Sequence, residues 1–414
     1  MEKTPRLAFI LITSLFLAWG IANNMTDTLL AAFKRIMSMT DFQTTFVQYA
    51  FYGAYFCFAV PAALFIKKFT YKSGVLLGLG MFILGALLFF PASKTMAYGH
   101  FLVALYILAG GLSFLETSAN PFIVAMGPPE TGTQRLNLAQ SFNPVGSITG
   151  VLLSKLFILS NLNRADANER AMMDASQLQA IQTHELAAVM VPYVGIALVL
   201  LVLWVLIKLT PMPSASDADS SLHLGASVKR LLRNRNYVLA VVAQFFYVGA
   251  QIGVWSFTIR FVMQELNLTE EEASGYYLGA LVLFLVFRFV STALMKIVKA
   301  TSLLTALALA AMVLAGVVVV GEGYVAVYAL VGISACMSLM FPTIYALGLV
   351  GLEDDTKIGG SGLVMAILGG AVITGVQGQV SDLTGSIHLA YLVPLACFGI
   401  VAYYGTVAGK LASR

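Results

Sequence analysis

Two acidic residues lie inside long apolar stretches of the sequence, where a charged group is costly. Asp27 lies late in the first apolar stretch, and Glu116 lies in the middle of the fourth. A charged side chain at the centre of a bilayer costs about 2.5 to 3.5 kcal/mol on insertion scales, so each acid needs a reason to be there. Burial favours the protonated form of a carboxyl group and brings proton exchange towards neutral pH, as a proton carrier requires. We therefore predict that Asp27 and Glu116 carry the coupled protons. The alternatives are a structural hydrogen bond to another helix and, for Asp27, an exposed position at a helix end.

Side chains that can hydrogen-bond neutral hydroxyl groups recur around these acids at helical spacing. Residues three or four apart share one face of a helix. Carboxamides both donate and accept hydrogen bonds, and aromatic rings can cover the C–H faces of a sugar, so the pattern predicts a sugar site. For any single amide, packing between membrane helices is the alternative. The candidates are Trp19, Asn23, Glu116, Asn120, Gln140, Asn143, Tyr247, Gln251, Trp255 and Tyr345, with Tyr52, Tyr55 and Phe341 as weaker aromatic candidates.

The overall composition places these residues in a membrane protein. The 414 residues are 59% hydrophobic and 11% charged, with a mean hydropathy of +0.86, whereas about a quarter of the residues in a soluble domain are charged. The net charge is only +4, and no run combines clustered basic residues with aromatics, so nucleic acid is not an expected partner. Cys57, Cys336 and Cys397 are far apart and have no metal-type spacing. Because the four histidines fall in loops or at span ends, we predict no metal, no cofactor and no enzymatic site.

The apolar stretches are long enough to be membrane-spanning helices, which need about 20 mainly apolar residues. Orientation follows from the excess of Lys and Arg in inner loops. With the amino terminus inside, the outer segments hold only Lys34, Arg35, Lys94, Arg164 and Arg170 of the 24 basic residues. We therefore predict that both termini are cytoplasmic. The twelve predicted spans are 7–33, 43–66, 73–92, 101–126, 136–160, 187–209, 237–264, 272–295, 301–320, 324–350, 358–381 and 389–409.

The chain also repeats itself at a long offset. Residues 120–127 (NPFIVAMG) match residues 341–348 (FPTIYALG), and each segment leads into a charged turn. We predict an all-α membrane protein with twelve transmembrane helices in two six-helix, pseudo-symmetric halves, a 1–210 bundle and a 236–414 bundle. A cytoplasmic linker, 211–235, joins them, and its basic run 229–235 is interpreted as an inner-leaflet anchor. Secondary transporters have this architecture, with the site between the halves near the midplane. The pairs Gly146 with Gly150 and Gly275 with Gly279 predict close helix packing.

Four longer strings resemble the L-fucose:proton symporter family of the major facilitator superfamily. They are WGIANNMTD (19–27), LETSANPF (115–122), RLNLAQSFN (135–143) and QFFYVGAQ (244–251), and the likeness spans the chain. The family includes fucose permeases and glucose/galactose transporters. The resemblance implies proton-coupled sugar import, with Asp27 and Glu116 carrying protonation and sugar binding, and with Gln140, Asn143, Gln251 and nearby aromatics contacting the sugar. The 63–70 loop keeps the basic residues of the superfamily's usual loop pattern but lacks its first Gly and its Asp.

We therefore expect a monomeric proton:sugar symporter of the cell inner membrane that imports a hexose or deoxyhexose by alternating access. One rival is a proton-coupled exporter of sugars or drugs, which would have a more apolar cavity. Another is a sodium-coupled sugar transporter, and a third is a polytopic membrane enzyme, which would need a nucleophile, a metal or a histidine-based site. The sequence leaves open which sugar binds, the coupling stoichiometry and which acid carries the transported proton.

Overall fold

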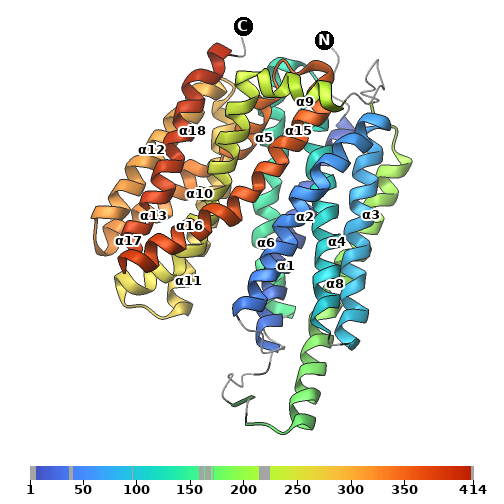
Figure 1. Cartoon of the computed structure of the whole chain (residues 1–414), viewed down its shortest axis with the longest axis vertical. Helices are drawn as coiled ribbons and strands as arrows, with labels where there is room; N and C mark the ends of the chain where they lie inside the picture. Colours follow the sequence, from blue (N-terminus) through green and yellow to red (C-terminus); the bar gives the residue numbers. More distant parts are fainter. Residues whose placement is uncertain are drawn as a thin grey trace.

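The structure is a computed structural model. It describes residues 6–36, 41–95, 97–157, 163, 169–170, 172–213 and 224–411, and for residues 23, 25–35, 41–45, 48, 155, 188, 189, 191, 409 and 411 it describes the backbone alone. Every regular element within these ranges is helical (Figure 1). Ten stretches of the described helices are long and apolar enough to cross a membrane. Together with α1 and the α5–α6 pair, they account for the twelve predicted spans.

The helices form two groups in chain order (Figure 1). In the first half, α3 packs on α4, α1 on α6, α2 on α4, and α3 on α8. Its elements are α1 (Arg6–Ile36), α2 (Asp41–Lys68), α3 (Tyr71–Thr95), α4 (Tyr98–Ala125), the 3-10 turn η1 (Pro129–Thr131), α5 (Gly132–Gln140), α6 (Phe142–Phe157) and α8 (Ala175–Leu209).

In the second half, α10 packs on α16 and α18, and α12 packs on α13 and α18. Its elements are α10 (Arg235–Leu266), α11 (Glu270–Leu294), α12 (Ala300–Val320), α13 (Gly323–Met337), α14 (Met340–Gly348), η3 (Glu353–Asp355), α15 (Thr356–Met365), η4 (Ala366–Leu368), α16 (Gly369–Thr384), α17 (Ile387–Ala390) and α18 (Leu392–Leu411). Within the predicted linker lies one further helix, α9 (Leu224–Arg233).

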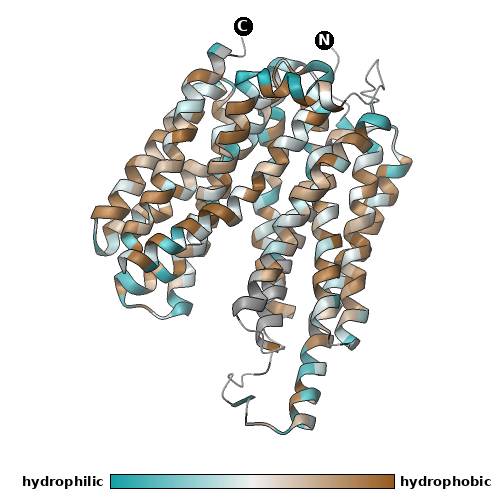
Figure 2. Ribbon diagram, viewed as in Figure 1, coloured by the Kyte–Doolittle hydropathy of each residue, from teal (hydrophilic) through white to brown (hydrophobic). Residues whose placement is uncertain are grey.

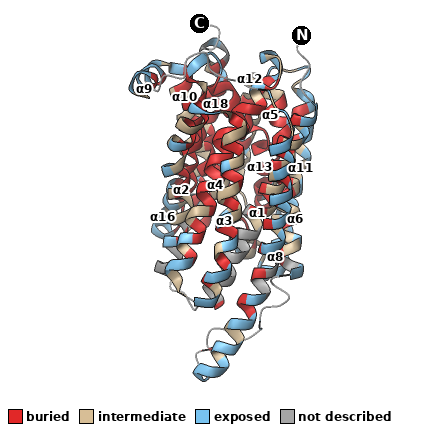
Figure 3. Cartoon of the chain, turned by 90° about the vertical axis from the view of Figure 1, so that its right-hand side faces the viewer, coloured by how far each residue is buried: buried red, intermediate tan, exposed pale blue. Residues whose placement is uncertain are grey.

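The two halves contact each other through α2 with α15, α4 with α15, and α5 with α14. The ribbons of the halves meet at the end of the molecule where α1 begins and α18 ends, which we call the terminal end, and they diverge towards the opposite, distal end (Figure 1). Hydrophilic residues gather at both ends, whereas the middle of the bundle is mainly hydrophobic (Figure 2). The buried residues concentrate inside the half of the bundle next to the terminal end, and they include an unbroken run from Leu108 to Ile123 of α4 (Figure 3).

Four predicted spans are interrupted, and three of the interruptions lie just before a proline. The breaks at Ser141, Leu339 and Tyr391 stand three residues before Pro144, Pro342 and Pro394. Proline has no N–H to donate to the carbonyl four residues earlier, and its ring clashes with that carbonyl. The chain therefore turns at these positions and restarts a helix. Another interruption, at η4, precedes the pair Gly369-Gly370 and involves no proline.

Glycines allow some helices within a half to touch through their backbones. A methyl group added at Gly146 would collide with the Leu17 carbonyl of α1, and one added at Gly150 would lie 2.6 Å from the Ile21 carbonyl oxygen. This pair confirms the packing prediction. At Gly275 and Gly279 no described atom lies within 4 Å of an added methyl group, so the prediction of close packing there is wrong.

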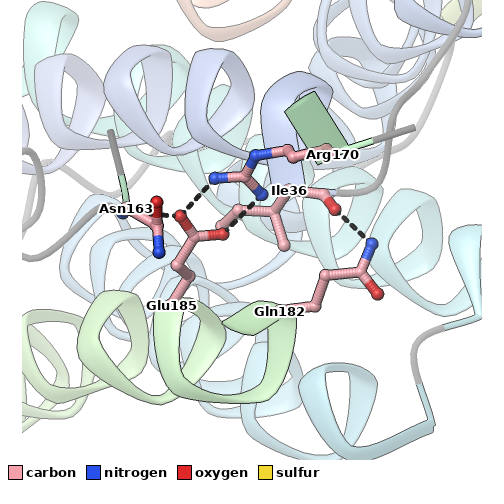
Figure 4. A network of polar contacts seen from close by, with 5 residues as sticks. All are labelled: Ile36, Asn163, Arg170, Gln182 and Glu185. Carbon is pink, nitrogen blue, oxygen red and sulfur yellow. Dashed lines mark hydrogen bonds and ion pairs between the residues drawn. The ribbon is translucent and has the colours of Figure 1, made fainter. Parts of the chain in front are cut away.

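The distal end of the first half carries a buried ion pair (Figure 4). Arg170 contacts Glu185 with both terminal nitrogens, at 2.6 and 2.9 Å, and the two side chains are almost fully buried. Glu185 also accepts the backbone N–H of Asn163, and Gln182 donates to the carbonyl of Ile36 at the end of α1. These bonds hold the first turns of α8, which extend twelve residues before the predicted span 187–209, against the ends of neighbouring segments.

The distal end of the second half is joined by a histidine. His388 of α17 lies 2.7 Å from the Val318 carbonyl through Nδ1 and 2.6 Å from Glu265 through Nε2. Glu265 accepts the backbone N–H of Gly323 with its other oxygen, at 2.6 Å. The ends of α10, α12, α13 and α17 are therefore tied together.

Candidate functional site

Glu116 is the buried acid of the structure's central region. It lies in the middle of α4 with 6% of its surface exposed. The hydroxyl of Tyr55, on α2, donates to Oε1 at 3.3 Å, and Oε2 has no hydrogen-bond partner among the described residues. One carboxyl oxygen therefore stays available for a proton or for a substrate hydroxyl group.

A chain of amides begins one helical turn after this acid. Asn120 shares the face of Glu116 and accepts a hydrogen bond from the Nε2 atom of Gln140 at 2.8 Å, while its own Nδ2 atom has no partner among the described side chains. The predicted neighbourhood of Glu116, Asn120 and Gln140 is thus present. Arg288 of the second half extends it, because its NH1 group lies 3.3 Å from the carbonyl oxygen and 3.5 Å from the Oε1 atom of Gln140.

The Gln140 carbonyl can accept this bond because of the helix break. Its usual helical donor would be the N–H of residue 144, which is a proline. The proline thus frees a backbone acceptor next to the amide chain, at the boundary between the halves. The same break separates Gln140 from Asn143, whose Nδ2 atom instead donates to the Phe16 carbonyl of α1 at 3.4 Å.

Arg288 was not among the residues predicted from the sequence. It lies on α11 with 3% of its surface exposed, and its guanidinium group lies 4.8 Å from the centre of the Phe284 ring. Within the part of the chain that the structure describes, its Nε atom has no hydrogen-bond partner and its guanidinium group makes no ion pair. A basic residue inside the span 272–295 was the signal that could have identified it.

The predicted α10 residues form a second group on the other side of Arg288. Trp255 donates to the Ser334 hydroxyl at 3.2 Å and packs edge-on against Phe284, the ring that Arg288 also contacts. Gln251 is partly buried one turn earlier.

Tyr247, on the same face of α10, is fully buried, and its hydroxyl donates at 2.9 Å to the Met337 carbonyl beside the α13–α14 break. Gln244 precedes it by one turn and is fully buried, and neither of its amide atoms has a hydrogen-bond partner among the residues described. The sequence analysis did not single out Gln244 as a site residue, although it falls seven residues before Gln251.

Tyr345 and its neighbours belong to the contact between the halves. Its hydroxyl donates to the Gly360 carbonyl at 3.4 Å, and its ring stacks on Phe341. Tyr52 lies close to Gly370 of the second half. The weaker aromatic candidates Tyr52, Tyr55 and Phe341 are thus all near the predicted region.

Helix α5 presents one face to the second half. Gln134 donates to the Thr292 carbonyl at 3.3 Å, and Asn137 donates to the Thr343 hydroxyl at 3.1 Å. With Gln140 these residues stand three apart, so they share a face of the helix. The sequence analysis predicted Gln140 but not Gln134 or Asn137.

The side chains of Asp27 and Asn23 lie outside the described residues. Their predicted roles therefore stay predictions. Among the residues that are described, no group of three or more His, Cys, Asp and Glu side chains gathers as metal ligands.

Comparison with known proteins identifies the fold and the family. The family model of the Major Facilitator Superfamily matches residues 7–353. The chain is 40% identical to the L-fucose-proton symporter of Haemophilus influenzae, over 99% of this chain and 98% of that protein. It is 32% identical to the glucose/galactose transporter of Brucella abortus, over 99% and 96%. The crystal structure of a major facilitator superfamily transporter, FucP, in the outward conformation superposes with a TM-score of 0.91 and 41% identity, over 97% of this chain and 98% of that chain. The chain therefore belongs to the major facilitator superfamily of membrane transporters, in the family that contains the L-fucose:proton symporters.

Proposed function

We propose that this protein is a proton-coupled sugar symporter that imports a hexose or deoxyhexose such as L-fucose, galactose or glucose. The observation that carries the proposal is Glu116, a buried acid with one unpartnered carboxyl oxygen beside the amides of Asn120 and Gln140. The names of the relatives, which are fucose-proton symporters and glucose/galactose transporters, support the substrate class.

The side chains around Glu116 have distinct roles in this proposal. Glu116 takes up the coupled proton and, when protonated, donates a hydrogen bond to a sugar hydroxyl group. The free Nδ2 atom of Asn120 and the partly buried Gln251 bind further hydroxyl groups, while Trp19 and Trp255 cover the C–H faces of the ring. Gln140, Asn143, Tyr247 and Tyr345 already bond to protein groups, and they hold the site in shape.

Asp27 acts as the external proton sensor. It follows Trp19 by two helical turns towards the distal end of α1. Closing an ionised, unpaired acid into a dry interface costs several kcal/mol, so protonation of Asp27 precedes closure of that end. Proton uptake and sugar translocation are thereby coupled.

Transport proceeds by a relative movement of the halves. We assign residues 1–210 and 236–414 to the two halves and 211–235 to their linker, with both termini in the cytoplasm and the molecule in the cell inner membrane as a monomer. The contacts of α5 and α15 then lie on the cytoplasmic side, and the arrangement described here faces outward. The free energy of moving one charge through 100 mV is about 2.3 kcal/mol, which sustains roughly fiftyfold accumulation of sugar.

Transport by the purified protein in proteoliposomes tests the proposal. The vesicles are given a pH gradient, a sodium gradient or no gradient, and uptake of radiolabelled L-fucose, D-galactose and D-glucose is measured with and without a protonophore. We expect one of these sugars to accumulate only when the outside is acidic, and a protonophore to abolish its accumulation. Accumulation driven by a sodium gradient alone would show that the protein couples to sodium and not to protons. An absence of sugar exchange in every condition would reject the proposed substrate class.

A further inference from the structure

Helix α9 lies at the terminal end, at the side of the bundle (Figures 1 and 3). Two of its residues, Ser227 and Leu231, are buried against the second half, and Leu231 lies against Gly359. Arg230, on the same side, donates two hydrogen bonds of 2.7 Å to the carboxylate of Asp355. The helix is therefore firmly docked along one face.

The remaining face of α9 is exposed and divided into two stripes. Val228 and Leu232 stand one turn apart and form an apolar stripe, with 39% and 68% of their surfaces exposed. Lys229 and Arg233 also stand one turn apart and form a cationic stripe directly beside it, and both are exposed. A short helix with an apolar edge next to a basic face is typical of helices that lie in the interface of a membrane.

We propose that this face of α9 is a docking surface for anionic phospholipid headgroups of the inner leaflet. The apolar stripe enters the boundary between headgroups and acyl chains, and the two basic side chains contact the lipid phosphates. The inference uses the predicted cytoplasmic position of the terminal end but does not depend on sugar or proton transport. Charge complementarity selects the lipid, since zwitterionic headgroups offer no net charge to Lys229 and Arg233.

The docking surface is connected to the contact between the halves. Arg230 holds the η3 turn through Asp355, and α15 begins at the next residue. Helix α15 packs against α2 and α4 of the first half. A lipid bound on α9 therefore braces the turn from which this contact starts.

Hydrogen–deuterium exchange of the full-length protein in lipid nanodiscs tests the proposal. Exchange of the amides in residues 224–233 is measured in dioleoylphosphatidylcholine and in mixtures with rising fractions of dioleoylphosphatidylglycerol. We expect exchange to slow as the anionic lipid is added. Each basic side chain near an anionic surface contributes a similar amount to the free energy of lipid binding. Loss of both Lys229 and Arg233 should therefore weaken binding about thirtyfold. The double variant Lys229→Gln/Arg233→Gln should therefore need an about thirtyfold higher fraction of anionic lipid for the same protection. That fraction cannot be reached, so we expect no slowing of exchange in this variant at any lipid composition.

A matched variant controls for net charge. Lys296→Gln/Lys299→Gln removes the same charge from exposed positions of the α11–α12 turn at the same end, and it should keep the protection of α9. Three results would overturn the proposal. They are an absence of protection in the wild-type protein, protection that persists in the α9 double variant, and an equal loss of protection in the control variant. Protection by inorganic phosphate in zwitterionic nanodiscs would also overturn it, because the ligand would then be a free anion and not a lipid.

Discussion

Replacing Arg288 by methionine should shift the protein away from the arrangement described here. Arg288 contributes one nitrogen to two atoms of Gln140 across the boundary between the halves, at 3.3 and 3.5 Å. These contacts join the two halves, and we expect them to break when the halves separate at the terminal end. The substitution therefore removes free energy from one state of the transport cycle and leaves the other largely unaffected.

The size of the shift follows from the geometry. A well-formed hydrogen bond from a charged group contributes about 1.5 to 3 kcal/mol, and the long distances place this one at or below the low end of that range. The Gln140 carbonyl, which Pro144 deprives of its helical donor, loses its partner as well, and an unsatisfied buried acceptor costs about 1 to 3 kcal/mol. Removing a buried cation also recovers a desolvation cost, but that gain applies to both states while Arg288 remains buried in each. A net change of about 2 kcal/mol corresponds to an about thirtyfold change in the ratio of states, for example from 99:1 to about 3:1.

Electron paramagnetic resonance distances between the distal ends of the halves measure this ratio. Spin labels on Gly99→Cys and Ser274→Cys, in a Cys57→Ser background, report the separation of exposed positions on α4 and α11. Arg288→Met should move population from the longer to the shorter distance, whereas Arg260→Met, which removes an exposed arginine of the same half, should not. An unchanged distribution, or equal shifts in both variants, would refute the reasoning.

Three further outcomes are expected. Glu116→Gln should flatten the pH dependence of sugar binding in calorimetric titrations from about pH 5 to 9, because a neutral amide mimics the protonated acid; a wild-type profile in this variant would remove Glu116 from the coupling. Asp27→Asn should abolish uphill accumulation in proteoliposomes but keep sugar binding and sugar-for-sugar exchange, and a variant that still accumulates sugar would show that Asp27 does not gate transport. Gly20→Ala should lower the thermal midpoint, because the added methyl group collides with the Asn143 carbonyl and overpacking costs about 1 to 3 kcal/mol. Gly80→Ala, with open space around it, should not lower the midpoint, and equal midpoints for the two alanine variants would contradict this packing argument.

Hydropathy and helical spacing were sufficient to predict the spans and part of the site. Long apolar stretches identify membrane helices because an unpaired backbone is too costly in lipid to allow irregular structure. The four-residue spacing of Glu116 and Asn120 placed them on one face, and the structure brings Gln140 to the same place. Such local patterns depend only on the geometry of a single helix.

Contacts between side chains of two different helices could not be predicted from these local patterns. Nothing in the spacing of α11 indicates that Arg288 reaches the carbonyl of Gln140, since that contact depends on the packing of the halves. The helix breaks before Pro144, Pro342 and Pro394 could not be predicted from the prolines alone. Other prolines lie inside unbroken helices, namely Pro61, Pro91, Pro121 and Pro192. The early start of α8 also escaped hydropathy, because its first turns are polar. Asp174, which accepts the Gln177 N–H at 2.8 Å as the helix cap, was the available signal.

The glycine contacts distinguish positions that set the thermal stability of the helix packing from positions that take part in the movement of the two halves. Where α1 meets α6 through Gly146, and where α3 meets α4 through Gly111, backbone lies against backbone and a single added methyl group is obstructed. Between the halves the described contacts are made by side chains such as Gln134 and Asn137, which can exchange partners by rotating bonds. Changes on the α5 face should therefore alter the exchange between the states of the carrier as well as its stability, because Asn137 is buried and hydrogen-bonded. Changes at the glycines instead lower the thermal stability of the helix packing, because the added methyl group meets backbone.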